Sequence, residues 1–221
     1  MKLRATERSE SKSKRNSNGK VPGAFYETQG GKDLFVASLI SHAVAALGIG
    51  TIFARSQAPK RVWMIGVACS MLPDIDVVGF RLGIRYGDFW GHRGFTHSLL
   101  FAAILATLAL ITGFSRGSPG LGRAWLWTYF FFATASHGFL DAMTDGGLGV
   151  ALFSPFDNTR YFFPWRPIVV SPISLSLFFS GKGFAVLESE LLWIWIPAGV
   201  LAISILILRR GFRTPSPESK A

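Results

Sequence analysis

The chain alternates long apolar runs with short charged connectors. Leu34–Ala54, Phe95–Phe114 and Leu191–Leu208 contain 21, 20 and 18 residues without a formal charge. A helix needs about 20 predominantly apolar residues to cross the hydrocarbon core of a bilayer. Each of these three runs therefore predicts a membrane-spanning helix.

Two further runs carry polar residues near one end. Ala124–Met143 is interrupted by a histidine and an aspartate close to its end, and Val62–Phe80 is cleanly apolar only as far as Leu72. Pro73 removes a backbone donor and disfavours helix at the residue before it. The pattern thus predicts an all-α polytopic membrane bundle of about five transmembrane helices, one of them broken at Pro73.

The segments outside these runs differ in composition. Residues 1–33 contain eight Lys or Arg and few apolar side chains, which predicts a basic, disordered tail. Residues 209–221 predict a second, shorter basic tail, and 34–208 is expected to form one membrane-embedded domain. Within that domain, 148–183 holds four prolines among large apolar residues. We expect it to form an amphipathic loop at the membrane interface.

Composition narrows the class further. Only 16% of residues are charged, whereas soluble domains usually carry about a quarter. The single cysteine, Cys69, excludes a disulfide framework and a multi-cysteine zinc site. In a membrane protein, the net charge of +10 indicates anionic lipid headgroups as partners rather than nucleic acid. The Lys and Arg residues near the helix ends divide almost evenly between the two sides of the membrane. Their small excess on the N-terminal side favours a cytoplasmic N-terminus.

All four histidines lie in or beside the apolar runs, together with several aspartates. Ionisable groups at membrane depth are costly unless paired or metal-bound, so they indicate a functional site, although any one alone fits a packing residue equally well. If the runs fold as hairpins about residues 58 and 119, His42 and Asp74 are equally far from the first turn. His97 and Asp141 are equally far from the second. With alternating crossings, all four side chains are predicted to lie in one layer.

Local spacing adds chemistry to this layer. His137 and Asp141 are four residues apart, so they share a helix face and can bind one metal ion. Asp145 would continue the same face by one more turn. Asp74 and Asp76 diverge on a helix but align in extended backbone, which the proline break before them makes plausible.

Gly91–Ser98 is the most specific stretch of the chain. The glycines that flank His92 and Arg93 allow backbone to approach a ligand closely. Thr96 is expected to cap the helix that follows, which would place His97 at a helix N-terminus that favours anions. Arg93 fits either an interfacial snorkelling cation or a phosphate or carboxylate clamp, and its histidine neighbours favour the clamp.

The ligand types indicate the metal. Imidazole and carboxylate without thiolate suit zinc first, then manganese or iron. The layer offers more ligands than one closed tetrahedral site requires, so one or two ions are expected, with His92 as an additional candidate ligand. A second ion would be bridged through Asp74 or Asp141.

These elements together resemble a known family. Ser41-His42, Leu72-Pro73-Asp74-Ile-Asp76, His92-Arg93-Gly94-Phe-Thr96-His97-Ser98 and His137-x-x-x-Asp141 are similar to the pattern of the YdjM-like family. Its members are described as LexA-regulated, inner-membrane-associated, metal-dependent hydrolases. The resemblance covers roughly residues 34–145. It implies a location in the bacterial inner membrane, which the apolar runs predict the chain crosses several times, and metal-dependent hydrolysis.

A fainter likeness points to the zinc-dependent phospholipase C and single-strand nuclease superfamily. It implies metal ligands at His42, Asp74, His97, His137 and Asp141. The chain lacks the further downstream histidines and the His-x-x-x-Glu of that pattern. This departure argues against three metals and leaves one or two.

The favoured interpretation is a metal-dependent hydrolase of a lipid or lipid-linked ester, most directly a phosphoester. A metal-activated water would attack, Arg93 would stabilise the developing charge, and Asp76 or Asp145 would take the proton. The alternative is a metal- or proton-coupled transporter, because broken helices with buried His and Asp also suit transport. The sequence shows no detectable inverted repeat, and this counts against a transporter. A non-catalytic adaptor would leave the ligand layer unexplained.

Overall fold

The computed structural model describes residues 37–53, 58–115, 121–171 and 182–211, and its regular elements are all helices. They are α2 (Ala37–Phe53), α3 (Lys60–Met71), the 3-10 helix η1 (Leu72–Leu82), the 3-10 turn η2 (Phe95–His97), α4 (Leu99–Phe114), α5 (Arg123–Ala142), α7 (Lys182–Glu190), the π-helical segment η3 (Leu191–Trp195) and α8 (Ile196–Gly211). The all-α prediction is therefore confirmed. The expected N-terminal tail and most of the expected C-terminal tail fall outside the described residues.

Each of the five apolar runs contains a helix, and the second is interrupted where the proline predicts. The α-helix α3 ends at Met71, and η1 continues from Leu72 with Pro73 in its first turn. The expected extended backbone at Asp74 and Asp76 is wrong, because this segment winds into 3-10 helix. The two carboxylates consequently contact opposite nitrogens of the His97 ring, Asp74 facing Nε2 and Asp76 facing Nδ1.

Two stretches of helix are long and apolar enough to cross a membrane, Lys60–Leu82 and Gly183–Gly211, among the residues that the structure describes. The helices α2 and α4 are apolar but contain only 17 and 16 residues. At the helical rise they are about 25 Å long, somewhat less than the roughly 30 Å of a hydrocarbon core. By length and composition, the described helices thus provide two candidate spans rather than five.

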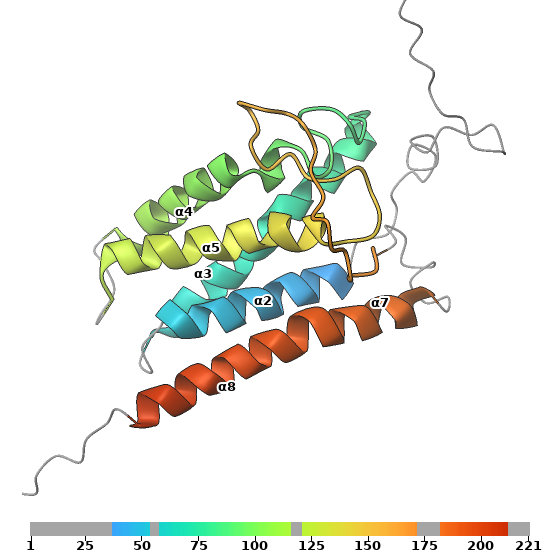
Figure 1. Cartoon of the computed structure of the whole chain (residues 1–221). Coiled ribbons are helices and arrows are strands. Elements are labelled where there is room, and N and C mark those ends of the chain that lie inside the picture. The colour runs from blue at the N-terminus through green and yellow to red at the C-terminus, as the bar shows by residue number, and fades with distance from the viewer. Residues whose placement is uncertain (1–36, 54–57, 116–120, 172–181, 212–221) are drawn as a thin grey trace, which may run out of the picture.

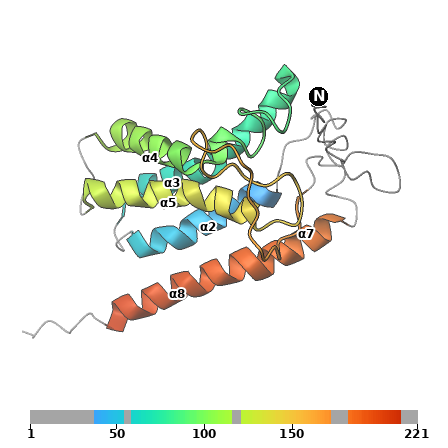
Figure 2. The same cartoon turned by 45° about the horizontal axis from the view of Figure 1, so that its top comes forward.

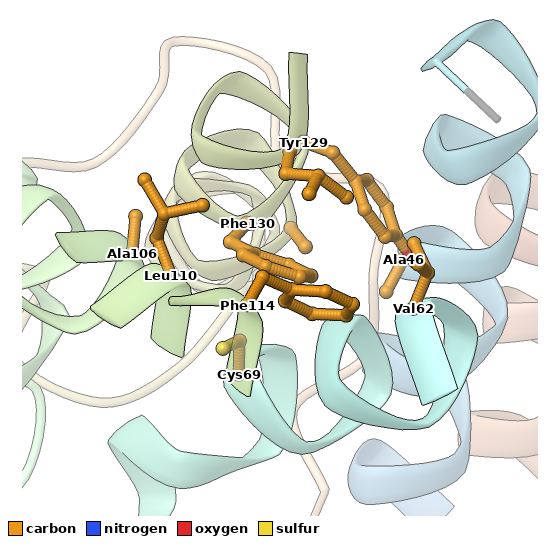
Figure 3. Packing of buried hydrophobic residues seen from close by; sticks show 10 residues of the cluster. Ala46, Val62, Cys69, Ala106, Leu110, Phe114, Tyr129 and Phe130 are labelled. Atoms are coloured by element: carbon orange, nitrogen blue, oxygen red, sulfur yellow. The ribbon is translucent and has the colours of Figure 1, made fainter. Parts of the chain in front are cut away.

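The helix α5 is the centre of the bundle and packs against α2, α3 and α4 (Figure 1). Its aromatic side chains Tyr129 and Phe130 are almost fully buried in a core that also takes Phe114 and Leu110 from α4 (Figure 3). Small residues let the neighbouring helices approach this helix closely. This arrangement fixes the relative positions of the elements that carry the ionisable layer.

Gly66 provides a test of that packing. A Cβ atom at Gly66 would overlap the hydroxyl of Tyr129, whereas a Cβ at Gly199 would meet nothing within 4 Å. We expect Gly66→Ala to destabilise the protein by about 1–3 kcal/mol through overpacking. Gly199→Ala should be neutral or slightly stabilising, since alanine is the better helix former. Thermal unfolding of the two variants in detergent measures the difference, and equal midpoints would contradict the packing.

The elements α7, η3 and α8 follow one another without a break and are called here the last helix. The last helix lies along α2 on the opposite side from α4 (Figures 1 and 2). A buried polar contact joins the two helices. The hydroxyl of Ser41 donates to Glu190 Oε2 at 2.7 Å and accepts from Trp195 Nε1 at 2.8 Å. Unpaired polar groups in an apolar environment cost several kcal/mol, so this contact specifies where the last helix docks.

The connection after α5 runs over one end of the bundle (Figures 1 and 2). Val150 and Leu152 are buried within it, and the backbone N–H of Leu99 donates to the Leu152 carbonyl at 3.0 Å. The first part of the 148–183 segment packs onto the fold, and its location at the membrane interface stays a prediction. The part at 172–181 lies outside the described residues.

Candidate metal centre

Two imidazoles and two carboxylates converge at the end of the bundle that this connection covers. The structure brings Asp74 from η1, His97 from η2, and His137 and Asp141 from α5 into one buried group, called here the His/Asp cluster. One ligand atom from each lies within 4.8 Å of the other three. The hairpin argument predicts this meeting of separate runs because it places their polar residues at matching depths.

The spacing of the cluster suits tetrahedral coordination. The Nε2 atoms of His97 and His137 are 3.1 Å apart, and His137 Nε2 is 3.3 Å from Asp74 Oδ1. Asp141 Oδ2 lies 3.3 Å from His97 Nε2 and 3.8 Å from His137 Nε2. A tetrahedral zinc ion with bonds of 2.0–2.1 Å separates neighbouring ligand atoms by roughly 3.3 Å. The cluster is therefore positioned to hold one metal ion.

The second nitrogen of each cluster histidine is anchored. His137 Nδ1 lies 2.7 Å from the Ser70 carbonyl oxygen, which can only accept, so Nδ1 carries the proton. His97 Nδ1 lies 3.2 Å from Asp76 Oδ2. His137 Nε2 is thereby left as a lone pair that faces the cluster. Asp76 can hold the His97 proton on Nδ1, which would leave His97 Nε2 for a metal ion, the usual arrangement of metal-binding histidines.

The electrostatics of the cluster call for a cation. Two nitrogen lone pairs and two carboxylate oxygens meet away from water, and Asp141 Oδ2 has no hydrogen-bond partner. The Arg93 guanidinium, whose Nε lies 3.1 Å from Asp141 Oδ2, offsets one of the two carboxylate charges, and the second carboxylate and the ring nitrogens favour a further positive charge among them. A divalent ion would supply that charge, and the donor set fits zinc first.

A second group adjoins the cluster. Asp76 Oδ1 lies 2.8 Å from His92 Nδ1, and Thr96 donates to Asp76 Oδ2 at 2.5 Å. Asp76, His92 and His97 lie close enough together to hold a metal ion as well. Among the described residues, however, the two groups share His97 rather than a carboxylate. Because Asp76 contacts the Nδ1 side of the His97 ring, the bridge through Asp74 or Asp141 stays a prediction.

The position of Asp76 yields a prediction about metal affinity. Since its carboxylate accepts from His97 Nδ1, it fixes the ring that presents Nε2 to the cluster. We expect Asp76→Asn to weaken metal binding about 10- to 100-fold, as is usual for such outer partners. Titration with a chromophoric competitor chelator measures this. The exposed Asp88→Asn is the matched control, and equal affinities in the two variants would exclude the role.

His42 lies beside the cluster rather than within it. Its ring stacks on His137 with centroids 3.6 Å apart, and its Nε2 is 3.8 Å from Asp141 Oδ1. Its Nδ1 is buried without a hydrogen-bond partner. The structure places His42 in the predicted layer, next to the four residues of the cluster, and its role as a metal ligand stays a prediction.

Arg93 is buried and faces the protein. Its Nε lies 3.1 Å from Asp141 Oδ2, and its Nη1 donates to Thr144 Oγ1 at 2.9 Å and to the Gly146 carbonyl at 3.0 Å. The backbone of Arg93 is in the left-handed region, with φ +61°. Such a conformation is uncommon outside glycine and persists where surrounding contacts impose it. The side chain connects the cluster to the loop after α5.

The glycines beside Arg93 serve the fold of their own segment. A Cβ at Gly91 would overlap backbone carbonyls of Arg85 and Tyr86, and one at Gly94 would overlap that of Phe89. The close approach that the sequence assigns to a ligand is therefore an approach of backbone to backbone. The predicted cap is also shifted, because Ser98 rather than Thr96 accepts from the backbone N–H of Phe101 and caps α4.

Asp145 is not part of the layer. The helix α5 ends at Ala142, so the chain leaves the helical face before it reaches this residue. Asp145 is exposed, and its Oδ1 accepts from the backbone N–H of Val170 at 2.8 Å. The prediction that Asp145 continues the face of His137 and Asp141 is wrong because the helix stops one turn earlier.

Sequence reasoning missed several residues that support the site. Arg160 donates to the carbonyls of His92 and Tyr86 and so fastens the loop after α5 to the segment before α4. Tyr86 packs edge-on against His92, and burial raises its pKa to about 12, so it stays a neutral phenol. Glu190 was detectable as a carboxylate at the start of an apolar run. Arg160 carries no comparable sequence signal.

Comparison with known proteins agrees with these features. The family described as YdjM inner membrane protein matches residues 38–212. The chain is 40% identical to the inner membrane protein YbcI of Escherichia coli (strain K12) over 173 residues, which cover 78% of this chain and 98% of that protein. No solved structure matches. The family match extends through the loop after α5 and the last helix, beyond the 34–145 that the sequence motifs alone indicate.

Proposed function

The chain belongs to the YdjM family of inner membrane proteins, and we propose that it is a membrane-embedded, metal-dependent hydrolase of a lipid or lipid-linked ester, most directly a phosphoester. The single observation that carries this proposal is the His/Asp cluster with its near-tetrahedral spacing. Zinc is the first candidate ion, followed by manganese or iron. When bound, such an ion lowers the pKa of water and polarises an ester, the chemistry of hydrolysis.

The residues around the cluster have separable roles in this proposal. Asp76 orients His97, and three contacts to neighbouring side chains occupy its carboxylate. Asp76 is therefore a positioning residue rather than the proton acceptor that the sequence suggests. Arg93 orients Asp141. His42 Nδ1 is buried beside the cluster without a hydrogen-bond partner among the described residues, and we propose that it meets substrate or water.

The proposal includes five membrane crossings. The helices α2, α3, α4, α5 and α8 form one bundle, and the Ser41–Glu190 and Arg209–Ile52 contacts align α8 with α2 in the same direction. That alignment suits strictly alternating crossings with short helices in a locally thinned bilayer. The N-terminus is proposed to be cytoplasmic.

Cysteine accessibility tests this topology. In a Cys69→Ser background, cysteines at Ala58 and Gly122 should react from one side of the membrane. Cysteines at Trp90 and Phe156 should react from the other, because alternating crossings separate the two ends of the bundle. Labelling of positions 58 and 90 from the same side would contradict both the topology and the shared depth of the layer.

Hydrolysis by the purified protein tests the activity. The full chain in nanodiscs is assayed with a chromogenic phosphodiester and with a phospholipid, before and after chelation and with zinc or manganese restored. The proposal predicts metal-dependent turnover that is lost in His97→Ala. Absence of turnover from the metal-loaded protein on esters of both kinds would contradict it.

One observation favours transport as the second candidate. The helix that carries Asp74 changes from α to 3-10 helix at Leu72, and broken helices line the ion sites of many transporters. Proteoliposomes loaded with a zinc-sensitive dye distinguish the two functions. Transport predicts metal flux in protein that hydrolyses nothing, whereas the hydrolase predicts turnover without flux.

A further inference from the structure

An apolar pocket of about 310 Å³ lies between α2, α5 and the last helix. This volume is at the low end of the range of ligand pockets, roughly 300–1,000 Å³. Its wall is hydrocarbon apart from the Ser136 hydroxyl and the Trp193 indole. The lining includes Ala45, Ile49, Phe132, Leu140, Ile194 and Ala198.

The pocket adjoins the His/Asp cluster along two helices. On α5, Ser136 and Leu140 line the pocket, and the residues that follow them in the chain, His137 and Asp141, belong to the cluster. On α2, Ala45 lies one helical turn beyond His42. From Leu140 to Phe132 the pocket extends about 12 Å along α5 at the helical rise. One end therefore lies at the level of the cluster and the other deeper in the bundle.

The rim of the pocket is continuous with the surface that faces lipid. Phe132, Phe139 and Trp193 line it and are 46%, 38% and 43% exposed. The outer face of α8 continues this surface with exposed Val200 and Ile203. In an inner membrane protein, such a rim opens sideways into the hydrocarbon rather than into water.

The third wall of the pocket is held in place by specific contacts. Near the cluster, the Ser41–Glu190 and Ser41–Trp195 hydrogen bonds tie the last helix to α2. Farther along, a Cβ at Gly48 would come within 2.9 Å of the Ala198 Cβ, so the two helices meet closely there. These contacts hold the last helix against α2 along the pocket wall, of which Gly48 and Ala198 are part.

From this geometry we infer that the pocket binds a hydrocarbon chain of a membrane lipid, which enters sideways between α5 and the last helix. This inference rests on the proposed function, and it specifies the substrate as a lipid whose ester or phosphoester lies next to its chain. A polar ligand is disfavoured because the wall would leave its hydrogen-bonding groups unpaired. The Ser136 hydroxyl already donates to the Ala133 carbonyl of its own helix.

Photolabelling tests the inference without relying on turnover. The full chain is reconstituted in nanodiscs of phosphatidylethanolamine and phosphatidylglycerol that contain a phosphatidylethanolamine with a diazirine at the end of one acyl chain. After irradiation, mass spectrometry locates the labelled peptides. We expect label to concentrate on 132–140 and 193–201. Label spread evenly over the exposed residues of α4 and α8 would overturn the inference.

Two matched variants sharpen the test. Ser136→Phe fills the pocket and should lower labelling of its walls several-fold, whereas Ser204→Phe, on the exposed face of α8, should not. Ala45→Leu narrows the pocket from α2 and is the second variant if Ser136→Phe unfolds. Unchanged labelling in a folded, pocket-filled variant would also overturn the inference.

The same experiment separates this inference from the proposed function. His97→Ala removes a cluster ligand but leaves the pocket walls intact, so pocket labelling should persist in that variant. Concentrated label in a protein without metal or turnover would refute the hydrolase and keep the pocket. Metal-dependent turnover with evenly spread label would support the hydrolase and refute lipid binding in the pocket.

Discussion

Asp74→Asn is expected to abolish stoichiometric metal binding and to lower any metal-dependent turnover at least about 100-fold. Asp74 Oδ1 lies 3.3 Å from His137 Nε2 and 3.6 Å from His97 Nε2. The substitution keeps the volume of the side chain but removes the negative charge that balances a divalent ion. Loss of a residue that only hydrogen-bonds a metal ligand already lowers metal affinity 10- to 100-fold, so the loss of a ligand itself should cost at least as much.

The matched control for Asp74→Asn is Asp145→Asn. Asp145 is exposed, and the amide oxygen of asparagine can still accept from the Val170 N–H. Metal content after gel filtration and turnover on a phosphodiester are measured for both variants in the same detergent. Equal metal content in the two would show that the carboxylate at position 74 is not a ligand.

Arg93→Lys has the second largest expected effect. Lysine keeps the positive charge but has a single nitrogen, whereas Arg93 reaches Asp141 with Nε and Thr144 and Gly146 with Nη1. We expect metal affinity to fall about 10- to 100-fold because Asp141 loses its orienting partner. Turnover should fall with it.

This outcome differs from that of a clamp on the substrate, which loses turnover while metal affinity stays normal. Competition with a chelator and turnover at saturating metal separate the two effects. Arg123→Lys is the control, because Arg123 is exposed and its Nη1 donates to the Ser115 carbonyl, away from the cluster. Normal metal affinity with lost turnover in Arg93→Lys would indicate that Arg93 contacts the substrate. Normal metal affinity with normal turnover would exclude both that role and the orientation of Asp141.

The sequence was sufficient for the helices and for the gathering of the ionisable layer. Apolar runs and a proline determine where helices begin and break, and these are local properties of the chain. Equal distances from the hairpin turns predict one depth for His42 and Asp74 and one for His97 and Asp141, because antiparallel helices rise at the same rate. The His/Asp cluster follows from that regularity together with the i, i+4 spacing of His137 and Asp141.

The remaining details depend on tertiary contacts that have no local pattern. The 3-10 winding after Pro73 separates Asp76 from Asp74, and no residue type in this segment distinguishes it from extended chain. The Arg93 guanidinium points to the protein because Thr144 and Gly146 return to it from a loop about fifty residues later. Asp145 lies outside the layer because α5 ends at Ala142, and the ends of a helix are its least predictable part.

The measurement that tests the central claim most directly is the metal stoichiometry of the purified full-length protein, determined by elemental mass spectrometry beside His97→Ala. His97 belongs to both groups of potential ligands, so its loss affects either site. We predict at least one divalent ion per chain in the wild-type protein after chelator-free purification and zinc reloading, and far less than one in His97→Ala. Wild-type protein that stays metal-free after reloading, or equal metal content in both proteins, would contradict the assignment of the cluster as a metal centre.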